Sequence, residues 1–136
     1  MGKMEPTGLV KRVITSRDAA SGTGPYSPAL VVGDFVFVSG QGPLHPQTLE
    51  IRGASIEEQT RLTFNNIEAL LKAAGSSLQN LVRVSVYLSD INNYERFNDT
   101  YCGLIKAPFP VRTTVACGLQ GILIEVDCIA TVSHAA

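Results

Sequence analysis

Two charged residues stand inside apolar segments near the end of the chain. Arg112 follows Phe109-Pro110-Val111 at the start of a predicted strand, and Glu125 lies in the middle of the final apolar segment, with Asp127 two residues on. A charge buried alone is costly, so each of these side chains needs a partner. A guanidinium matches a carboxylate through two parallel hydrogen bonds, and a glutamate can accept a proton from water.

Two interpretations of this pair are open. In the first, Arg112 and Glu125 neutralise each other or a charge on a neighbouring subunit, and their role is structural. In the second, Arg112 holds the carboxylate of a small ligand while Glu125 acts on a water molecule or on the ligand itself. The second interpretation predicts a small-molecule site.

Further polar residues lie where such a site could use them. Asn98 stands at the edge of the apolar stripe of a predicted helix, where a buried amide must find partners and most often ties down a nearby loop. Tyr26 belongs to a rigid segment, GPYSP at 24–28, that leads into a strand, and a second rigid segment, SGQGP at 39–43, follows the next strand. Rigid loops at strand ends are a common place for chemistry, so we expect these two segments to form one wall of the site.

The elements that must position these residues can be read from periodicity and turn signals. Strands are predicted over 10–16, 29–32, 35–39, 81–88, 111–116 and 122–132. On the strand over 81–88 we expect Val82, Val84, Val86 and Leu88 to share one face. One helix is predicted to begin after a capping box at Ser55 and to end at Gly75. A second is predicted from about residue 92 to the segment before Ala107-Pro108.

The order of these elements predicts an α+β fold. Each helix joins two strands, which favours parallel pairs with crossover helices and a mixed sheet of about six strands with both helices on one face. The final strand, ILIEVDCIATV, carries apolar residues on both of its faces. We therefore expect the uncovered face to be buried against another copy of the chain, as a homo-oligomer.

Composition excludes several classes of function. The chain has 136 residues, 45% hydrophobic and 17% charged, with a net charge of −1, which is typical of a single globular domain over 1–136; residues 1–10 are expected to be a loose tail. No basic cluster supports nucleic-acid binding, and no apolar run approaches the roughly 20 residues that span a membrane. Cys102, Cys117 and Cys128 lie in apolar segments, so we expect buried, reduced thiols and an intracellular, cytoplasmic protein.

Several ordered motifs together resemble the RidA family, also called YjgF or endoribonuclease L-PSP. The resemblance extends from about Val13 to Val132. The matching segments are GPYSPA at 24–29, FVSGQ at 37–41, QTRLTFNNIEALLKAAG at 59–75, VSVYLSD at 84–90, FNDTY at 97–101, FPVRT at 109–113 and IEVDCIA at 124–130.

The resemblance implies a fold, an assembly and an activity. The fold is the chorismate-mutase-like α+β sandwich, assembled as a homotrimer whose sheets pack inward and whose ligand sites lie between subunits. The activity is the hydrolytic deamination of 2-iminopropanoate and 2-iminobutanoate to the 2-oxo acids and ammonia. The family needs no metal and no organic cofactor.

The resemblance also implies roles for individual residues. Arg112 corresponds to the arginine that binds the substrate carboxylate, and Glu125 to the glutamate that positions the attacking water. Tyr26 and Gly40 would line the cleft, and Asn98 would support it.

The sequence departs from the family pattern at two places near this site. Thr114 stands where many members have a cysteine, so a substrate-binding role there would fall to its backbone, and any role of a thiol is lost. The loop GLQG at 118–121 is shorter than usual, which could alter the shape of the cleft and the substrate preference.

Two other functions remain to be weighed. A non-catalytic or regulatory trimer would bind a small carboxylate through Arg112 without turnover, and the two departures leave that alternative open. Ribonuclease activity, which one family name suggests, is disfavoured by the balanced charge and the lack of candidate catalytic histidines.

Overall fold

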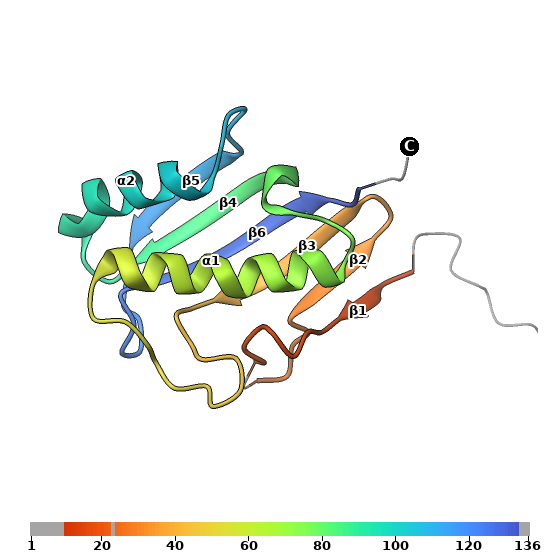
Figure 1. The fold of residues 1–136 in the computed structure, drawn as a ribbon, viewed down its shortest axis with the longest axis horizontal. Helices are drawn as coiled ribbons and strands as arrows, with labels where there is room; N and C mark the ends of the chain where they lie inside the picture. The colour runs from red at the N-terminus through yellow and green to blue at the C-terminus, as the bar shows by residue number, and fades with distance from the viewer. Residues whose placement is uncertain (1–9, 23, 134–136) are drawn as a thin grey trace, which may run out of the picture.

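The computed structural model describes residues 10–22 and 24–133, so the tail expected over 1–10 lies almost wholly outside the described residues. Figure 1 shows the arrangement of the elements. In chain order they are β1 (Arg12–Ile14), β2 (Ala29–Val32), β3 (Phe35–Gln41), α1 (Ile56–Ala73), the short 3₁₀ helix η1 (Leu78–Asn80), β4 (Leu81–Leu88), a second 3₁₀ helix η2 (Ile91–Asn93), α2 (Tyr94–Leu104), β5 (Val111–Ala116) and β6 (Ile124–Thr131).

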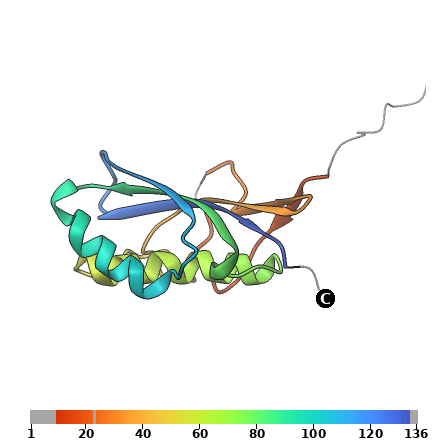
Figure 2. The same cartoon turned by 90° about the horizontal axis from the view of Figure 1, so that it is seen from above.

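The six strands form one mixed sheet in the order β1-β2-β3-β6-β4-β5. Only β4 and β5 pair in parallel, and the last strand, β6, runs antiparallel between β3 and β4. Both helices lie on the same face of this sheet (Figure 2). The predicted α+β architecture is therefore confirmed. In this strand order β6 lies inside the sheet and β5 lies at its edge; these are the two strands that carry the candidate site residues.

Helix α1 begins and ends where its sequence signals predicted. The Ser55 hydroxyl accepts a hydrogen bond from the backbone N–H of Glu58, while the Glu58 carboxylate accepts from the N–H of Ala54 rather than from that of Ser55. Gly75 follows the helix with φ of +78°, the left-handed conformation that glycine adopts without steric cost. The predicted stripe is buried against the sheet: Ile56, Thr60, Thr63, Ile67, Leu70, Leu71 and Ala74.

Two β-bulges interrupt the alternation of side chains on β6's neighbours. On β4, Leu81 pairs with Ala130 and Arg83 with Ile129, so one extra residue is inserted at Val82. Val82 is consequently exposed, and the prediction that it shares the buried face of Val84 is wrong. On β3 the register shifts between Val38 and Gln41, which places a bulge at residues 39–40, within the segment expected to line the site.

The two faces of the sheet differ in how they are covered. The helix side holds the hydrophobic core, in which Val84, Val86, Ile124 and Val126 are almost fully buried. The opposite face, here called the open face, has no helix over it (Figure 2). It exposes large apolar side chains, namely Phe35, Phe37, Val111 and Val115, each more than 40% accessible.

The cysteines depart from expectation. Cys128 is buried in the core, where burial raises the pKa of its thiol strongly, but Cys102 and Cys117 are exposed. Cys102 occupies a position of α2 that does not face the sheet, and Cys117 follows the last residue of the edge strand. An apolar sequence context therefore does not bury a side chain that lies on the outer side of its element.

Among residues 10–22 and 24–133, no helix has both the length and the apolar character needed to cross a membrane.

Candidate functional site

Arg112 projects from the edge strand β5 toward helix α2. It pairs with the buried Val84 of β4, which places its side chain on the helix face of the sheet. One guanidinium nitrogen, Nη2, donates to the Oδ1 of Asn98 at 2.7 Å and to the hydroxyl of Tyr94 at 3.3 Å. Asn98 therefore holds the arginine rather than a loop, and the two residues that the sequence analysis treated separately are joined.

Three aromatic rings of α2 surround the same guanidinium. Its carbon lies 4.8 Å from the ring centroid of Tyr101, 5.2 Å from that of Phe97 and 5.8 Å from that of Tyr94. Rings at these distances attract a cation through their quadrupoles. The hydrogen bond from Asn98, followed by that from Arg112, lowers the pKa of the Tyr94 hydroxyl. Within the described part of the chain no carboxylate pairs with Arg112, so its charge is held in place without being neutralised.

A pocket of about 350 Å³ opens beside this guanidinium. It is lined by Asn98, Tyr101, Cys102, Phe109, Pro110 and Arg112. Its walls are largely apolar, and a half-buried cation stands at one side. An arrangement of this kind suits a small molecule that carries one carboxylate, because the guanidinium has donors free for a second pair of hydrogen bonds.

Glu125 lies on the other face of the sheet. It is paired with Tyr87 on β4 and alternates with the buried Ile124 and Val126, so its side chain projects from the open face. Its carboxylate lines two adjoining pockets, of about 600 Å³ and 420 Å³, that also share Tyr26 and Gly40. Of the residues that the structure describes, none forms a hydrogen bond or ion pair with this carboxylate.

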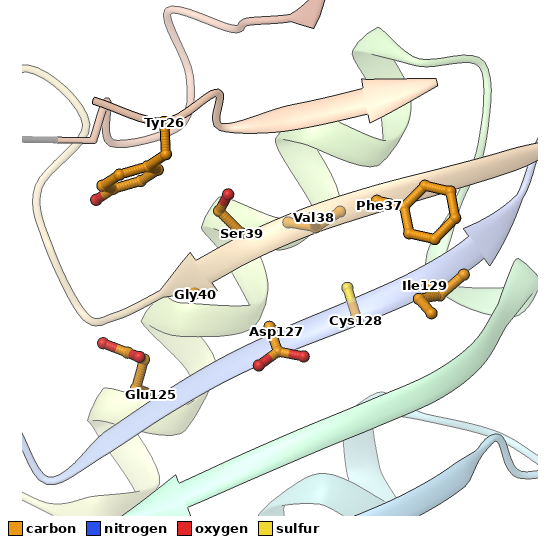
Figure 3. Close-up of a pocket in the computed structure, with 9 residues that line it drawn as sticks. All are labelled: Tyr26, Phe37, Val38, Ser39, Gly40, Glu125, Asp127, Cys128 and Ile129. Atoms are coloured by element: carbon orange, nitrogen blue, oxygen red, sulfur yellow. The ribbon is translucent and has the colours of Figure 1, made fainter. Parts of the chain in front are cut away.

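The bulge in β3 brings the backbone of Gly40 against Glu125. A Cβ atom at position 40 would lie 2.8 Å from Oε2 of Glu125, so only glycine leaves room for the carboxylate as it stands. Figure 3 shows the Tyr26 ring and the Glu125 carboxylate on either side of Gly40. Tyr26 in turn packs over its own loop, because a Cβ at Gly22 would meet the Tyr26 ring at 2.6 Å. Gly22 and Gly40 are thus required because a neighbouring side chain lies close to each of them, not because either has an unusual φ.

A second carboxylate influences Glu125. Asp127, two residues further along β6, points from the same face and accepts a hydrogen bond from the Tyr87 hydroxyl at 3.0 Å. Burial, and to a smaller extent the charge of Asp127, raises the pKa of Glu125 above its ordinary value. The same Asp127 raises the pKa of Tyr87. Glu125 is therefore a stronger base than an exposed glutamate.

Two buried amides on α1, which the sequence analysis missed, hold the loops of the site. Asn66 accepts from the N–H of Ala20 and donates to the carbonyls of Gly42 and Leu44, so it joins the segments before Tyr26 and after Gly40. Gln59 accepts from the N–H of Leu123, just before β6, and donates to the carbonyl of Gly53. The sequence could have indicated both amides, since each falls on the side of the helix that the apolar stripe predicts to be buried.

The site residues expected from the sequence thus fall into two groups. Arg112 and Asn98 meet on the helix face, and Thr114 lies on the same face two residues along β5, its buried hydroxyl without a hydrogen-bond partner among the described residues. Tyr26, Gly40 and Glu125 meet on the open face. Within one chain Arg112 and Glu125 do not pair with each other, because they project from opposite faces of the sheet; that part of the first interpretation is wrong, and pairing with a charge on a neighbouring subunit stays a prediction.

Among residues 10–22 and 24–133, no three His, Cys, Asp or Glu side chains gather in a way that could hold a metal ion.

Most of the chain matches one known family of proteins. The endoribonuclease L-PSP family model matches residues 16–132. A RutC family protein of Pyrococcus abyssi is 40% identical over 124 residues, which cover 90% of this chain and 98% of that protein. The human 2-iminobutanoate/2-iminopropanoate deaminase is 32% identical over 126 residues, covering 91% of this chain and 92% of the human protein.

A solved structure agrees with these sequence relatives. The crystal structure of Escherichia coli TdcF with bound serine superposes with a TM-score of 0.83 at 31% identity, covering 90% of this chain and all of that one. The chain therefore belongs to the endoribonuclease L-PSP, or RidA, family.

Proposed function

We propose that this protein hydrolyses 2-imino acids to 2-oxo acids and ammonia, at sites shared between two copies of the chain. The proposal rests on where two charged residues lie. Arg112 is a cation without a carboxylate partner among the described residues, and it stands beside one pocket. Glu125 is a carboxylate without a partner among them, beside two further pockets, and it lies on the opposite face of the sheet. One chain cannot bring them together. A second copy can, by placing its Glu125 against the first copy's edge strand β5.

The exposed apolar residues of the open face support such an assembly. Phe35, Phe37, Val111 and Val115 would be covered if the sheets of several copies packed with their open faces together, and large apolar side chains gain most from such burial. A closed homotrimer, which the family resemblance implies, would bury this face in every copy and form three equivalent sites.

In the proposed site the substrate is oriented by its carboxylate. The guanidinium of Arg112 donates two parallel hydrogen bonds to it, while Asn98 and Tyr94 keep the guanidinium from rotating away. The electrophilic imine carbon, next to the carboxylate, is then held at a fixed place relative to the partner copy's Glu125. Fixing the reacting groups in this way lowers the barrier by several kcal/mol, about 7 or more in the best intramolecular cases.

Glu125 supplies the base. The substrate enters as the iminium, C=NH₂⁺. A water molecule held by the carboxylate adds through oxygen to the iminium carbon, one water proton passes to Glu125, and the C=N electron pair becomes the lone pair of the amino nitrogen. Glu125 gives this proton to the amino nitrogen of the carbinolamine, the C–N bond breaks, and the hydroxyl proton passes back to Glu125 as the carbonyl forms. Ammonia takes up that last proton and leaves as ammonium, which restores the carboxylate. Burial, and to a smaller extent the charge of Asp127, raises the pKa of Glu125, which makes its carboxylate a better proton acceptor than that of an exposed glutamate.

The relative named as an imine deaminase supports this reaction class, because the chain matches it over nine tenths of its length. The experiment that tests both the reaction and the shared site is subunit complementation. Arg112→Ala and Glu125→Gln proteins are each expected to be inactive on 2-iminobutanoate formed in situ by a threonine dehydratase. Unfolded together and refolded as mixed trimers, they should recover activity, because some interfaces then contain an intact arginine and an intact glutamate.

For random mixing of equal amounts in a trimer, about a quarter of the sites should be intact. If both residues of a site came from one chain, no mixture would recover activity, and the shared-site proposal would fail. If the unmodified protein did not accelerate loss of the imine over buffer, the proposed reaction itself would fail.

A regulatory trimer that binds a small carboxylate is the second candidate, because Arg112 and the pocket beside it could hold a carboxylate without any part in catalysis. Calorimetry with 2-oxobutanoate would show binding under both hypotheses. Only the enzyme hypothesis predicts hydrolysis of the imine.

A further inference from the structure

We propose that Arg83 of one copy forms an ion pair with Asp127 of a neighbouring copy, and that this pair sets the position in which the open faces of two copies meet. The inference rests on the proposed function, from which it takes the contact between copies. It adds the pair of side chains that would determine how one copy sits on the next.

Charged side chains are few on the open face. Arg83 on β4 and both Glu125 and Asp127 on β6 project from it, because each alternates with residues buried on the helix side. The other charged residues of the six strands are Arg12 and Arg112, and both belong to the helix side. The open face of the sheet thus carries one cation and two carboxylates in largely apolar surroundings.

None of these three charges meets an opposite charge within the chain. Among the described residues, neither the Arg83 guanidinium nor the Glu125 carboxylate has a hydrogen-bond or ion-pair partner, and Asp127 accepts only from the neutral hydroxyl of Tyr87. Arg83 stands opposite Ile129 in the ladder, not opposite Asp127. A charge buried without a partner is costly, so a second copy that covers this face must bring opposite charges to it.

The proposed site accounts for one of the three charges, because Glu125 would face Arg112 of the neighbouring copy. Arg83 and Asp127 are left, and they have opposite signs. Each copy therefore offers one cation and one anion. In a closed ring, each copy can give its Arg83 to one neighbour and receive the other neighbour's arginine on its Asp127, so that every charge is paired.

The positions of these residues agree with a single way of docking. On the copy that supplies the arginines, Arg83 pairs with Val111, the residue before Arg112, so the two arginines lie on neighbouring strands at one level of the sheet. On the copy that supplies the carboxylates, Glu125 and Asp127 lie close together on β6 (Figure 3), about 7 Å apart along the strand. The docking that brings Glu125 to Arg112 therefore also brings Asp127 toward Arg83.

Asp127 is held ready for a partner of this kind. The Tyr87 hydroxyl donates to its Oδ2 at 3.0 Å, whereas Oδ1 accepts from no residue that the structure describes. A guanidinium has a planar fork of donors that matches a carboxylate held in this way. Phe37, an exposed ring that lines the same pocket as Asp127, would keep water away from the pair once the face is covered, and the attraction would be screened less.

The test first reverses each charge separately. Arg83→Glu would set two carboxylates against each other at every contact, and Asp127→Arg would set two guanidinium groups there. Each variant should therefore need about 100-fold or more protein to assemble than wild type does, as measured by sedimentation velocity over a dilution series. Arg61→Glu and Asp18→Arg reverse exposed charges outside the sheet and are the controls that should assemble normally. Circular dichroism establishes that each chain is folded.

The two variants are then combined in two ways. In an equal mixture, an introduced carboxylate meets an introduced guanidinium at one kind of mixed contact, and the native pair is kept at the other. The mixture should therefore assemble at a concentration at least about tenfold lower than either variant alone. The chain that carries both Arg83→Glu and Asp127→Arg should recover most of the assembly of wild type.

The results that would overturn the inference can be told apart from failure of the proposed function. If the single variants assemble like the controls, the ion pair is not formed. If the double variant assembles but the mixture does not, the two residues pair within one chain, and the inference also fails. Loss of 2-iminobutanoate is followed separately with the wild-type protein: absence of hydrolysis by an assembled protein would remove the proposed reaction and leave the ion pair in place.

Discussion

Arg112 and Glu125 project from opposite faces of one sheet. Arg112 lies beside Val84 under helix α2, whereas Glu125 lies opposite Tyr87 on the open face, and strand β4 separates the two. Because a strand alternates its side chains, no rotamer change can bring these two residues together within a chain. The chemistry that they would perform together depends on contact between copies, so assembly and activity should be lost together whenever the open face is disrupted.

The Arg112 guanidinium is expected to bind through its fork of donors and not through its charge alone. Arg112→Ala should lower kcat/KM for 2-iminobutanoate by about 100-fold or more, because two charge-assisted hydrogen bonds are lost. Arg112→Lys should still lose about tenfold, since the ammonium lacks the planar fork that donates two parallel hydrogen bonds to a carboxylate while another donor holds Asn98. Steady-state kinetics check both values, with Arg61→Ala, an exposed arginine on α1, as the control that should behave as wild type.

The close approach of Gly40 to Glu125 can be tested with a substitution that changes no charge. In Gly40→Ala the new methyl would stand 2.8 Å from Oε2 of Glu125 and displace the carboxylate. We expect kcat to fall by about tenfold or more, whereas the stability should stay within about 1 kcal/mol of wild type, because the methyl meets the end of a flexible side chain at an exposed position. Gly103→Ala, in helix α2 with nothing within 4 Å, should keep full activity. Equal activity of the two variants would contradict the assignment of Glu125 as the base.

The acid side of the pH profile should report Glu125. Its carboxylate must be ionised to accept a proton, so kcat/KM should fall as the pH drops through its raised pKa. Burial is the larger cause of that rise and the charge of Asp127 the smaller, so Asp127→Asn should move the acid limb to lower pH without returning it to that of an exposed glutamate. Rates measured between pH 4 and pH 8 test the shift, and Asp18→Asn, an exposed aspartate before β2, should leave the limb in place. A shift to higher pH in Asp127→Asn would contradict the prediction.

Local sequence signals accounted for most of the fold and for part of the site. The cap at Ser55, the glycine at 75 and the apolar stripe between them predicted α1 correctly, because each acts over a few residues. The bulge at Val82 was missed, since an extra residue on one strand is visible only in the register with its partner. For the same reason the sequence could not place Arg112 and Glu125 on opposite faces: that depends on β6 entering the sheet between β3 and β4.

Asn66 should matter for stability far more than its neighbour Asn65. Asn66→Ala would leave the N–H of Ala20 and the carbonyls of Gly42 and Leu44 without partners in a mostly buried region. We expect the free energy of unfolding to fall by about 3 kcal/mol, roughly one for each lost hydrogen bond. Asn65→Ala, on the exposed side of the same helix, should change it by less than about 0.5 kcal/mol. Urea unfolding at one fixed chain concentration measures both, and equal effects would show that the buried amide does not anchor these loops.

Replacing the hydroxyl of Thr114 tests its role in ligand binding separately from its effect on stability. It is buried without a hydrogen-bond partner among the described residues, so Thr114→Val removes an unsatisfied polar group and keeps the side-chain shape. We expect the variant to be as stable as wild type or more stable by about 1 kcal/mol. If the hydroxyl instead donates to the ligand beside Arg112, the same variant should bind 2-oxobutanoate more weakly by about fivefold to tenfold in calorimetry, and Thr114→Ser should restore most of that affinity. Unchanged binding in Thr114→Val would remove the Thr114 side chain from the proposed site and leave only its backbone available to the substrate.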